Sequence, residues 1–293
     1  MPREHETVLA SAAHIGAGGK GLCQAIAARR LGAEVKVLGA VGEDMFGDYL
    51  LASMASEGID IAGVTSRSAG THLGIPILTD DGNNRIIGVP RASLYLTPAD
   101  VESNGDALSW ADVLLVQNET PLETITAAIQ SARQATLVVW NPAPARFSVT
   151  EVASSFGGRS GGWLTPNETE AGALTGIEVG DVDSGLAAAH RLQADVGAVG
   201  VVVTLGSQGA VAVDLDGQPH VAAPYTVRAV DPTAAGDTFT AALALRLKAG
   251  ASVPAALSFA CAAGAATATH FGAVTSIPTS TLVQALIDEA GCE

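Results

Sequence analysis

The chain has 293 residues, of which 48% are hydrophobic and 15% are charged, so it can form one large core or two unequal lobes. Its 30 acidic and 15 basic residues give a formal net charge of -15, which excludes a basic surface for nucleic acid or for an anionic membrane. An anionic ligand must therefore be held locally, by helix N-termini, backbone amides or a metal ion.

The cysteines and the apolar stretches of the chain limit the class of protein to which it can belong. The three cysteines, Cys23, Cys261 and Cys292, form no CxxC pair, so neither a disulfide framework nor a zinc site is predicted. No apolar secretory segment follows the first residues, and we expect a reducing cytoplasm. Residues 249–287 contain no Asp, Glu, Lys or Arg, so a transmembrane helix is one interpretation of this stretch. Their prolines, glycines and hydroxyl residues favour a buried helix followed by a loop instead.

Short apolar runs alternate along the chain with alanine-rich stretches of helical periodicity. The runs are rich in β-branched residues and end in polar or glycine loops, as buried parallel strands do. Helices are predicted over residues 24–31, 122–133 and 185–196. This alternation predicts an α/β layered domain with a mostly parallel sheet. In chain order, the predicted strands lie in EVKVLGAVG, ADVLLVQNE, ATLVVWNPAP, GGWLTPNETEA and VGVVVTLGSQG.

Residues 71–89 break this pattern, because two strand-like runs flank Asp81 and Gly82. Such a pair predicts an antiparallel hairpin, which we interpret as part of a small lid beside the main sheet. The chain shows no long linker, internal repeat or low-complexity tail. One domain with an inserted lid is therefore expected.

In open α/β sheets, ligands bind beyond the carboxyl ends of the strands. The residues that follow the predicted strands are acidic, amide and glycine residues, so they are expected to line one rim. They are Glu119, Asn141, Asn167, Glu170 and residues 204–209.

Residues 16–21 read GAGGKG and match the GxGxxG pattern. A dinucleotide-binding dehydrogenase also needs a preceding strand and an acidic residue at the end of the next strand. Here TVLASAAHI makes a poor core strand and EVKVLGAVG ends in glycine. The segment fits better as a polar-ligand loop in which the Lys20 region contacts hydroxyl groups, although a plain glycine turn into a helix is an alternative.

Residues 231–239 read DPTAAGDTF and lie at a predicted helix start, since Phe239, Leu243 and Leu247 repeat at helical spacing. Free N–H groups and the helix dipole attract anions at such a position. The small side chains at residues 234–236 let a phosphoryl group reach the backbone. The alternative is that Asp237 only complements the dipole of the first turn.

Extended to VDPTAAGDTFTAAL, this segment closely resembles the C-terminal signature of the ribokinase/PfkB family of sugar kinases. GGKGLCQAIAARRLGAEVKVLGAVGEDMFG resembles the N-terminal signature, and VQNETP, WNPAPAR, TPNETEAGALTG and TLGSQGA match between the two. The resemblance covers nearly the whole chain and is strongest to the ribokinase branch. It implies a single three-layer α/β/α domain with a mostly parallel central sheet and a small β-sheet lid, formed by about residues 1–15 and 70–90. It also implies ATP-dependent phosphorylation of the 5-hydroxyl of ribose.

The resemblance implies that Asp237 is the general base for the sugar hydroxyl that attacks the γ-phosphate of ATP. The backbone amides of Ala234, Ala235 and Gly236 would form an anion hole for the transferred phosphoryl group. The sugar contacts that it implies are Gly19, Lys20, Gly21, Cys23, Glu119 and Asp237.

The nucleotide site is implied in the same way. Asn167 and Glu170 match an NxxE motif that organises Mg²⁺ and its waters near the phosphates. The loop after VGVVV would hold ATP through backbone and hydroxyl groups. The ATP-binding positions implied are Asn167, Glu170, Thr204, Gly206, Ser207, Gly209, Gly236 and Cys261.

The resemblance further implies a potassium site beside the anion hole, built mostly from backbone carbonyls and one carboxylate, a set that suits a hard cation of low charge. The alternative is a buried loop that binds no ion. The matching positions are Asp231, Thr233, Thr267, His270, Gly272 and Ser276.

The chain departs from the family's pattern at its start, at Cys23 and at the ASL of residues 92–94, which replaces a usual GAN element. PREHETV matches a lid segment that normally follows a first core strand, so about two dozen residues are expected to be absent, which would leave ladder groups unpaired. Either the start is misassigned, or the chain is a truncated nucleotide-binding pseudoenzyme. Cys23 also replaces an expected asparagine, exchanging an amide for a weak thiol donor, so another sugar or a nucleoside is an alternative substrate.

Lid strands have edges that need covering, and we expect a homodimer through the lid.

Overall fold

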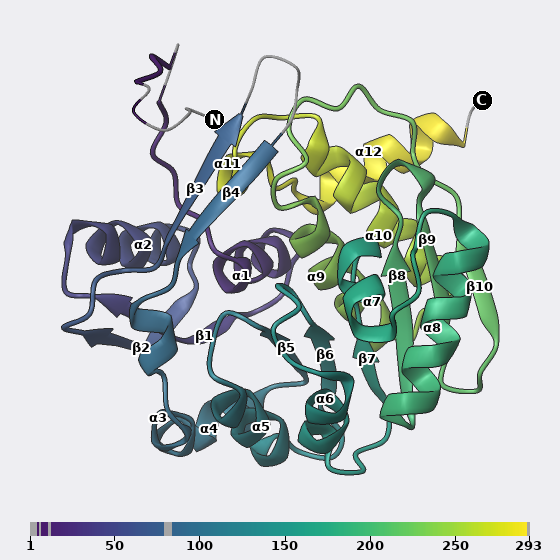
Figure 1. The fold of residues 1–293 in the computed structure, drawn as a ribbon, viewed down its shortest axis with the longest axis horizontal. Helices are drawn as coiled ribbons and strands as arrows, with labels where there is room; N and C mark the ends of the chain where they lie inside the picture. The colour runs from purple at the N-terminus through teal and green to yellow at the C-terminus, as the bar shows by residue number, and fades with distance from the viewer. Residues whose placement is uncertain (1–4, 6, 11–12, 79–83, 292–293) are drawn as a thin grey trace.

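The structure is a computed structural model that describes residues 5, 7–10, 13–78 and 84–291. Its centre is a six-stranded sheet with the strand order β10-β9-β8-β7-β6-β5 (Figure 1). The pairs from β5 to β8 are parallel, whereas β9 pairs antiparallel with both β8 and β10. The strands are β5 (Val113–Gln117), β6 (Leu137–Asn141), β7 (Gly162–Leu164), β8 (Val199–Thr204), β9 (Ala210–Val213) and β10 (Pro219–Ala222).

The central strands are buried on both faces, which explains their continuous apolar runs. In β6, Val138 and Trp140 join the core cluster on one face of the sheet, and Val139 joins the cluster on the other. Successive side chains of a strand point to opposite faces, so each run supplies two cores at once.

Helices cover both faces of this sheet (Figure 1). The fold is therefore a three-layer α/β/α domain with a mostly parallel sheet, as predicted. One face packs against α5 (Leu122–Ser131), α6 (Val149–Phe156), α7 (Glu168–Thr175) and α8 (Val182–Val196). The other face packs against α9 (Ala235–Lys248), α10 (Val253–Ala268) and α12 (Ser280–Ala290).

A separate parallel pair of strands, β1 (Lys36–Gly42) and β2 (Asp60–Arg67), lies beside the central sheet (Figure 1). The helices α1 (Lys20–Arg30) and α2 (Met45–Ser56) pack on this pair through Ile26 and Met54. Because Leu115 of β5 belongs to the same cluster, α1 contacts both the small pair and the central sheet. This position brings the glycine-rich start of α1 to the rim of the central sheet.

The hairpin predicted over residues 71–89 is present as β3 (Leu73–Leu78) and β4 (Asn84–Val89). It forms a two-stranded sheet separate from the central sheet (Figure 1), and the predicted turn at Asp81 and Gly82 lies outside the described residues. The described residues that precede α1 form no strand, so their share in the lid stays a prediction.

The uncharged stretch over residues 249–287 forms α10, α11 (Ala273–Ser276), the loops that join them and part of α12, with half of the residues of α10 buried. Within the part of the chain that the structure describes, no helix is both long and apolar enough to cross a membrane. The remaining elements are η1 (Ala92–Tyr95), α3 (Pro98–Ser103), α4 (Gly105–Trp110) and η2 (Gly206–Gln208).

Candidate active site

The carboxyl ends of the parallel strands meet the start of α1, α7 and α9 at one rim of the sheet. Hydrogen bonds join the loops that follow neighbouring strands. The Nδ2 atom of Asn141, at the end of β6, donates to the carbonyl of Thr165 at 2.7 Å. Asn167, beyond the end of β7, forms a parallel bridge with Thr204, the last residue of β8. The rim that the sequence predicted is therefore a connected surface.

Asp237 lies in the first turn of α9, and its Oδ1 accepts a hydrogen bond from Nε2 of Gln24 at 3.0 Å. Burial raises the pKa of this carboxyl group to about 6. The charge of Lys20 and the hydrogen bond from Gln24 lower the pKa, while the carboxylates of Glu119 and Glu170 raise it. A carboxylate with a pKa near neutrality is suited to take up a proton during a reaction.

The start of α9 offers free backbone donors. Ala234 caps the helix with a φ of 63°, a left-handed conformation that costs a non-glycine residue about 1–2 kcal/mol. The amide of Ala235 donates to the carbonyl of Pro232 at 3.1 Å. Among the described residues, the amides of Gly236 and Asp237 have no hydrogen-bond partner. Two donors and the helix dipole thus face the solvent beside Asp237, where an anion can bind.

The glycine-rich loop before α1 packs tightly against the segment after β5. The amide of Lys20 donates to Oε2 of Glu119 at 2.9 Å. A Cβ atom on Gly21 would lie 3.3 Å from Oε1 of Gln117, and Gly19 has a φ of 102°. Glycine is required at Gly19 because other residues rarely adopt this conformation.

Lys20 is the cation among the acidic groups at this rim. Burial lowers the pKa of its ammonium group, but the charges of Asp237, Glu170 and Glu119 outweigh burial and raise the pKa overall. The side chain therefore stays protonated and offsets part of the negative charge around it.

Cys23 faces the same charged groups from the first turn of α1. It is 3% exposed and forms no disulfide. Burial, together with the charges of Asp237 and Glu119, raises the pKa of its thiol well above the usual range. The side chain is a neutral thiol, which is a weak hydrogen-bond donor.

Asn167 and Glu170 form a capping box that starts α7. Oδ1 of Asn167 accepts from the amide of Glu170 at 2.9 Å, and Oε2 of Glu170 accepts from the amide of Asn167 at 2.9 Å. Burial raises the pKa of the Glu170 carboxyl group. Its Oε1 atom has no hydrogen-bond partner in the described part of the chain, so this oxygen can bind a water of a hydrated cation.

The loop after β8 is shaped by backbone contacts. The amide of Leu205 donates to the carbonyl of Gly209 at 2.8 Å, and Gly206 and Gly209 have positive φ angles of 52° and 91°. A Cβ atom on Gly209 would lie 2.2 Å from the carbonyl oxygen of Ala222, so only glycine fits there. Ser207 is exposed, whereas Thr204 is half-buried at the end of β8. The loop therefore presents backbone and hydroxyl groups beside Asn167.

Cys261 lies in α10 within the core cluster that covers one face of the sheet. Burial raises the pKa of its thiol to about 12, so it is neutral. Its assignment to the ATP site stays a prediction.

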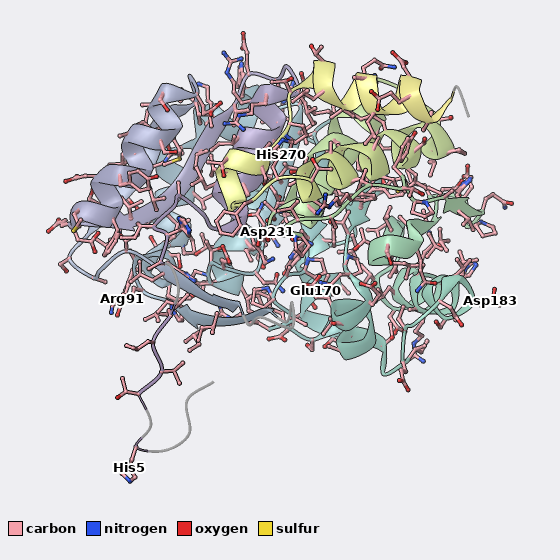
Figure 2. The ribbon with its side chains drawn as sticks, turned by 90° about the horizontal axis from the view of Figure 1, so that it is seen from above. His5, Arg91, Glu170, Asp183, Asp231 and His270 are labelled. Carbon is pink, nitrogen blue, oxygen red and sulfur yellow. The ribbon has the colours of Figure 1, made fainter. Side chains whose placement is uncertain are left out.

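The positions proposed for a potassium ion come together where the loop before α9 meets the loop after α10. Oδ2 of Asp231 accepts from the amide of Gly272 at 3.0 Å, and Oδ1 accepts from the amide and hydroxyl of Thr233 at 3.0 and 2.6 Å. Burial raises the pKa of Asp231, but these hydrogen bonds lower it by more, so the group is ionised. Figure 2 places Asp231 and His270 in the central part of the molecule, whereas Asp183 lies at its periphery.

Thr267 and Ser276 are buried in α10 and α11, and their hydroxyl groups donate to the carbonyls of Ala263 and Ala273 within the same helices. An ionised carboxylate is a ligand that suits a hard monovalent cation, but here two backbone amides and one hydroxyl donate to the carboxylate of Asp231, so the potassium site stays a prediction. Within the described residues, no group of three or more His, Cys, Asp or Glu side chains forms a centre for a more tightly held metal.

Comparison with known proteins assigns the chain to a family. A family model described as "pfkB family carbohydrate kinase" matches residues 2–280. The chain belongs to the pfkB family of carbohydrate kinases. It is therefore a phosphotransferase with an alcohol group as acceptor, which overturns the dehydrogenase alternative for GAGGKG.

Several relatives and solved structures resemble this pfkB-family kinase. A ribokinase of Haemophilus influenzae is 37% identical over 276 residues, which cover 94% of this chain and 88% of the relative. A deoxyribokinase of Salmonella typhi is 36% identical over 241 residues, covering 82% of this chain and 77% of the relative. The ribokinase of Thermotoga maritima superposes with a TM-score of 0.85 at 30% identity, covering 98% and 93% of the two chains. The Arabidopsis thaliana ribokinase complexed with ribose and ATP gives a TM-score of 0.84 at 29% identity, covering 98% and 92%.

Two residues of the site were not predicted. Gln24 and Gln117 lie between the predicted positions and hydrogen-bond to each other at 2.5 Å. The signal was present for Gln24, since it is a polar residue within the apolar helical run LCQAIAA. A buried polar side chain needs a hydrogen-bond partner, and such a residue therefore marks a specific contact.

Proposed function

We propose that this pfkB-family kinase transfers the γ-phosphoryl group of ATP to the 5-hydroxyl of D-ribose, forming ribose 5-phosphate and ADP. The observation that carries the proposal is the position of Asp237, a carboxylate with a raised pKa beside the free amides at the start of α9. The ribokinases among the relatives, including the one complexed with ribose and ATP, support ribose as the acceptor.

Each reacting group has a counterpart in this chain. Asp237 takes the proton from the sugar hydroxyl, whose oxygen then bonds to the γ-phosphorus while the bond to ADP breaks. The free amides of Gly236 and Asp237 stabilise the charge on the transferred phosphoryl group, whereas the amide of Ala235, which the resemblance also implied, already donates to the carbonyl of Pro232. Glu119 and the start of α1 hold the sugar hydroxyls, because a carboxylate can accept two hydrogen bonds. Lys20 reduces the repulsion between the acidic rim and the phosphates.

We propose Mg²⁺ and K⁺ as the cations of this reaction. The free Oε1 of Glu170 would hold Mg²⁺ through its waters, and when bound Mg²⁺ neutralises charge on the phosphates. The loop around Asp231 and Gly272 would hold K⁺ and support the start of α9 from behind. The loop from Thr204 to Gly209 would bind the nucleotide.

A panel of acceptors tests the proposal. The protein with Mg²⁺, K⁺ and ATP is assayed for ADP release with ribose, 2-deoxyribose, fructose and adenosine. We expect the highest kcat/KM with ribose. A protein that binds ATP but phosphorylates none of these acceptors contradicts the proposal and favours the pseudoenzyme. 2-Deoxyribose is the second candidate, because a deoxyribokinase is 36% identical and Cys23 offers the sugar only a weak donor.

Replacing Cys23 by asparagine is expected to lower the KM for ribose about 3- to 10-fold, because one new neutral hydrogen bond contributes about 0.5–1.5 kcal/mol. The KM for ATP stays unchanged, since the thiol faces Glu119 and Asp237 on the acceptor side. Steady-state kinetics with each substrate varied in turn measure both values. Cys23→Ala serves as the control, and an unchanged or higher KM for ribose in a folded Cys23→Asn protein would contradict the role of this position.

We also propose a homodimer formed through the lid. Ile75 and Ile87 lie opposite each other on β3 and β4 and are 46% and 45% exposed, so the hairpin presents an apolar face and unpaired edges. Ile75→Lys combined with Ile87→Lys is expected to give a monomer in light scattering. Leu282→Lys, on the 56% exposed side chain in α12, is the matched control and should leave a dimer. A wild-type monomer at micromolar concentration would contradict the proposal.

The proposed location is the cytoplasm, where ATP is supplied and thiols stay reduced. Cys23 and Cys261 are both free thiols in the structure, which is compatible with this location. Fractionation of cells that express the protein with an epitope tag tests the assignment.

A further inference from the structure

A chain of side-chain amides leads from β5 and β6 to the carboxylate of Asp237. Nε2 of Gln117 donates to Oε1 of Gln24 at 2.5 Å, and Nε2 of Gln24 donates to Oδ1 of Asp237 at 3.0 Å. The same Nε2 atom lies 3.4 Å from Oδ1 of Asn141. Gln24 is 1% exposed, and these contacts give partners to both its NH₂ group and its oxygen.

The two neighbours decide which way the Gln24 amide faces. A carboxamide can present either its oxygen or its nitrogen to a partner. Because Gln117 donates to Gln24, the oxygen of Gln24 must face Gln117. Asn141 donates through Nδ2 to the carbonyl of Thr165, so it presents its own oxygen to Gln24. Both contacts turn the NH₂ group of Gln24 toward Asp237.

We propose that Gln24, oriented by Gln117, is a positioning residue for the general base. By holding Oδ1 of Asp237, it leaves Oδ2 for the sugar hydroxyl, and no other hydrogen bond holds this carboxylate within the described residues. The inference rests on the proposed function of Asp237.

The charged groups around Asp237 do not replace this contact. Lys20 from α1, Glu119 after β5 and Glu170 from α7 act on the carboxylate through charge, without a direct hydrogen bond. A charge changes the pKa of Asp237 but does not select one of its oxygens. The hydrogen bond from Gln24 does both, since it favours the ionised form and fixes the carboxylate plane.

The test replaces the amides by a side chain of similar length that cannot hydrogen-bond. Gln24→Met is expected to lower kcat for ribose roughly 10- to 100-fold, with the KM for ATP unchanged, because the base is held less well. The acid limb of the pH profile of kcat/KM should move to higher pH, since the carboxylate loses a donor. Gln193→Met is the matched control, because Gln193 lies in α8 and donates to the backbone carbonyls of Val199 and Asp214. It should leave kcat and the acid limb of the pH profile unchanged.

The role of Gln117 is tested by a double-mutant cycle. If Gln117 acts through Gln24, then Gln117→Met lowers kcat less than Gln24→Met does, and the double variant equals Gln24→Met alone. Additive effects would overturn the relay. If Gln24→Met does not fold, the pH profile of Gln117→Met tests the inference instead. A Gln24 side chain that is no longer oriented by Gln117 should move the acid limb to higher pH, and an unchanged limb would overturn the inference.

A readout without turnover separates this inference from the proposed function. Carbon-13 NMR of labelled aspartates follows the titration of Asp237 in the protein without substrates, and Asp237→Asn assigns the signal. We expect a higher pKa in Gln24→Met than in the wild type. A folded Gln24→Met protein with an unchanged pKa and unchanged kcat overturns the inference, whereas a wild type that phosphorylates no sugar overturns the proposed function.

Discussion

Replacing Asp237 by asparagine is expected to lower kcat for ribose roughly 10²- to 10⁴-fold, the usual contribution of a general base. The amide has nearly the same shape as the carboxylate and can still accept the hydrogen bond from Gln24. It cannot take up the proton of the attacking hydroxyl. The KM for ATP should change little, because the backbone amides at the start of α9 remain. Steady-state ADP release with ribose and ATP varied in turn measures both effects.

Asp183→Asn is the matched control for this variant. Asp183 lies in the first turn of α8, is exposed and is found at the periphery of the molecule (Figure 2). The same chemical change there should leave kcat within about threefold, since exposed substitutions have small effects. If Asp237→Asn folds, as thermal unfolding reports, and retains kcat within threefold of the wild type, then Asp237 is not the base.

The pH profile of kcat/KM for ribose is expected to fall below about pH 6. Burial raises the pKa of Asp237 to about 6, so the carboxyl group is protonated, and inactive as a base, at lower pH. Each pH unit below the pKa then lowers the ionised fraction about tenfold. Rates are measured from pH 5 to pH 8 in buffers of constant ionic strength.

The residual activity of Asp237→Asn provides the control for this assignment. ATP also titrates in this range, and an acid limb caused by the nucleotide would persist in the variant. We expect the limb to disappear. A wild-type profile that stays level down to pH 5 would show that the base titrates at a lower pH than the burial of Asp237 implies.

Most of the fold could be predicted from local sequence patterns. The β-branched runs became β5 to β8, and α5 and α8 begin at or within three residues of their predicted starts. The antiparallel pairing of β3 with β4 was likewise predicted. Such features depend on residues close together in the chain, where periodicity and turn chemistry act directly. The order of the strands in the sheets was not predicted, because strand order depends on contacts between distant segments.

The residues of the candidate site likewise fall into those that local sequence could predict and those that it could not. Asp237 and the small residues before it could be recognised, since a helix start with small side chains is a local pattern. The NxxE motif was recognised too, and the structure adds that it is a capping box. Gln24 and Gln117 were missed because their hydrogen bonds join residues 93 and 213 positions apart.

The sequence by itself determined the layered α/β fold and the place of Asp237 in the first turn of a helix, because hydrophobic periodicity and helix-start composition are properties of neighbouring residues. The role of Asp237 as the base was implied by the family resemblance and is part of the proposed function. Only the tertiary structure decided how Asp237 is ionised and which of its oxygens is free. Burial, the charges of Lys20 and Glu119, and the amide of Gln24 all reach Asp237 from segments that are distant in the chain. The strength of these effects depends on distance and solvent exclusion, which exist only after the chain has folded.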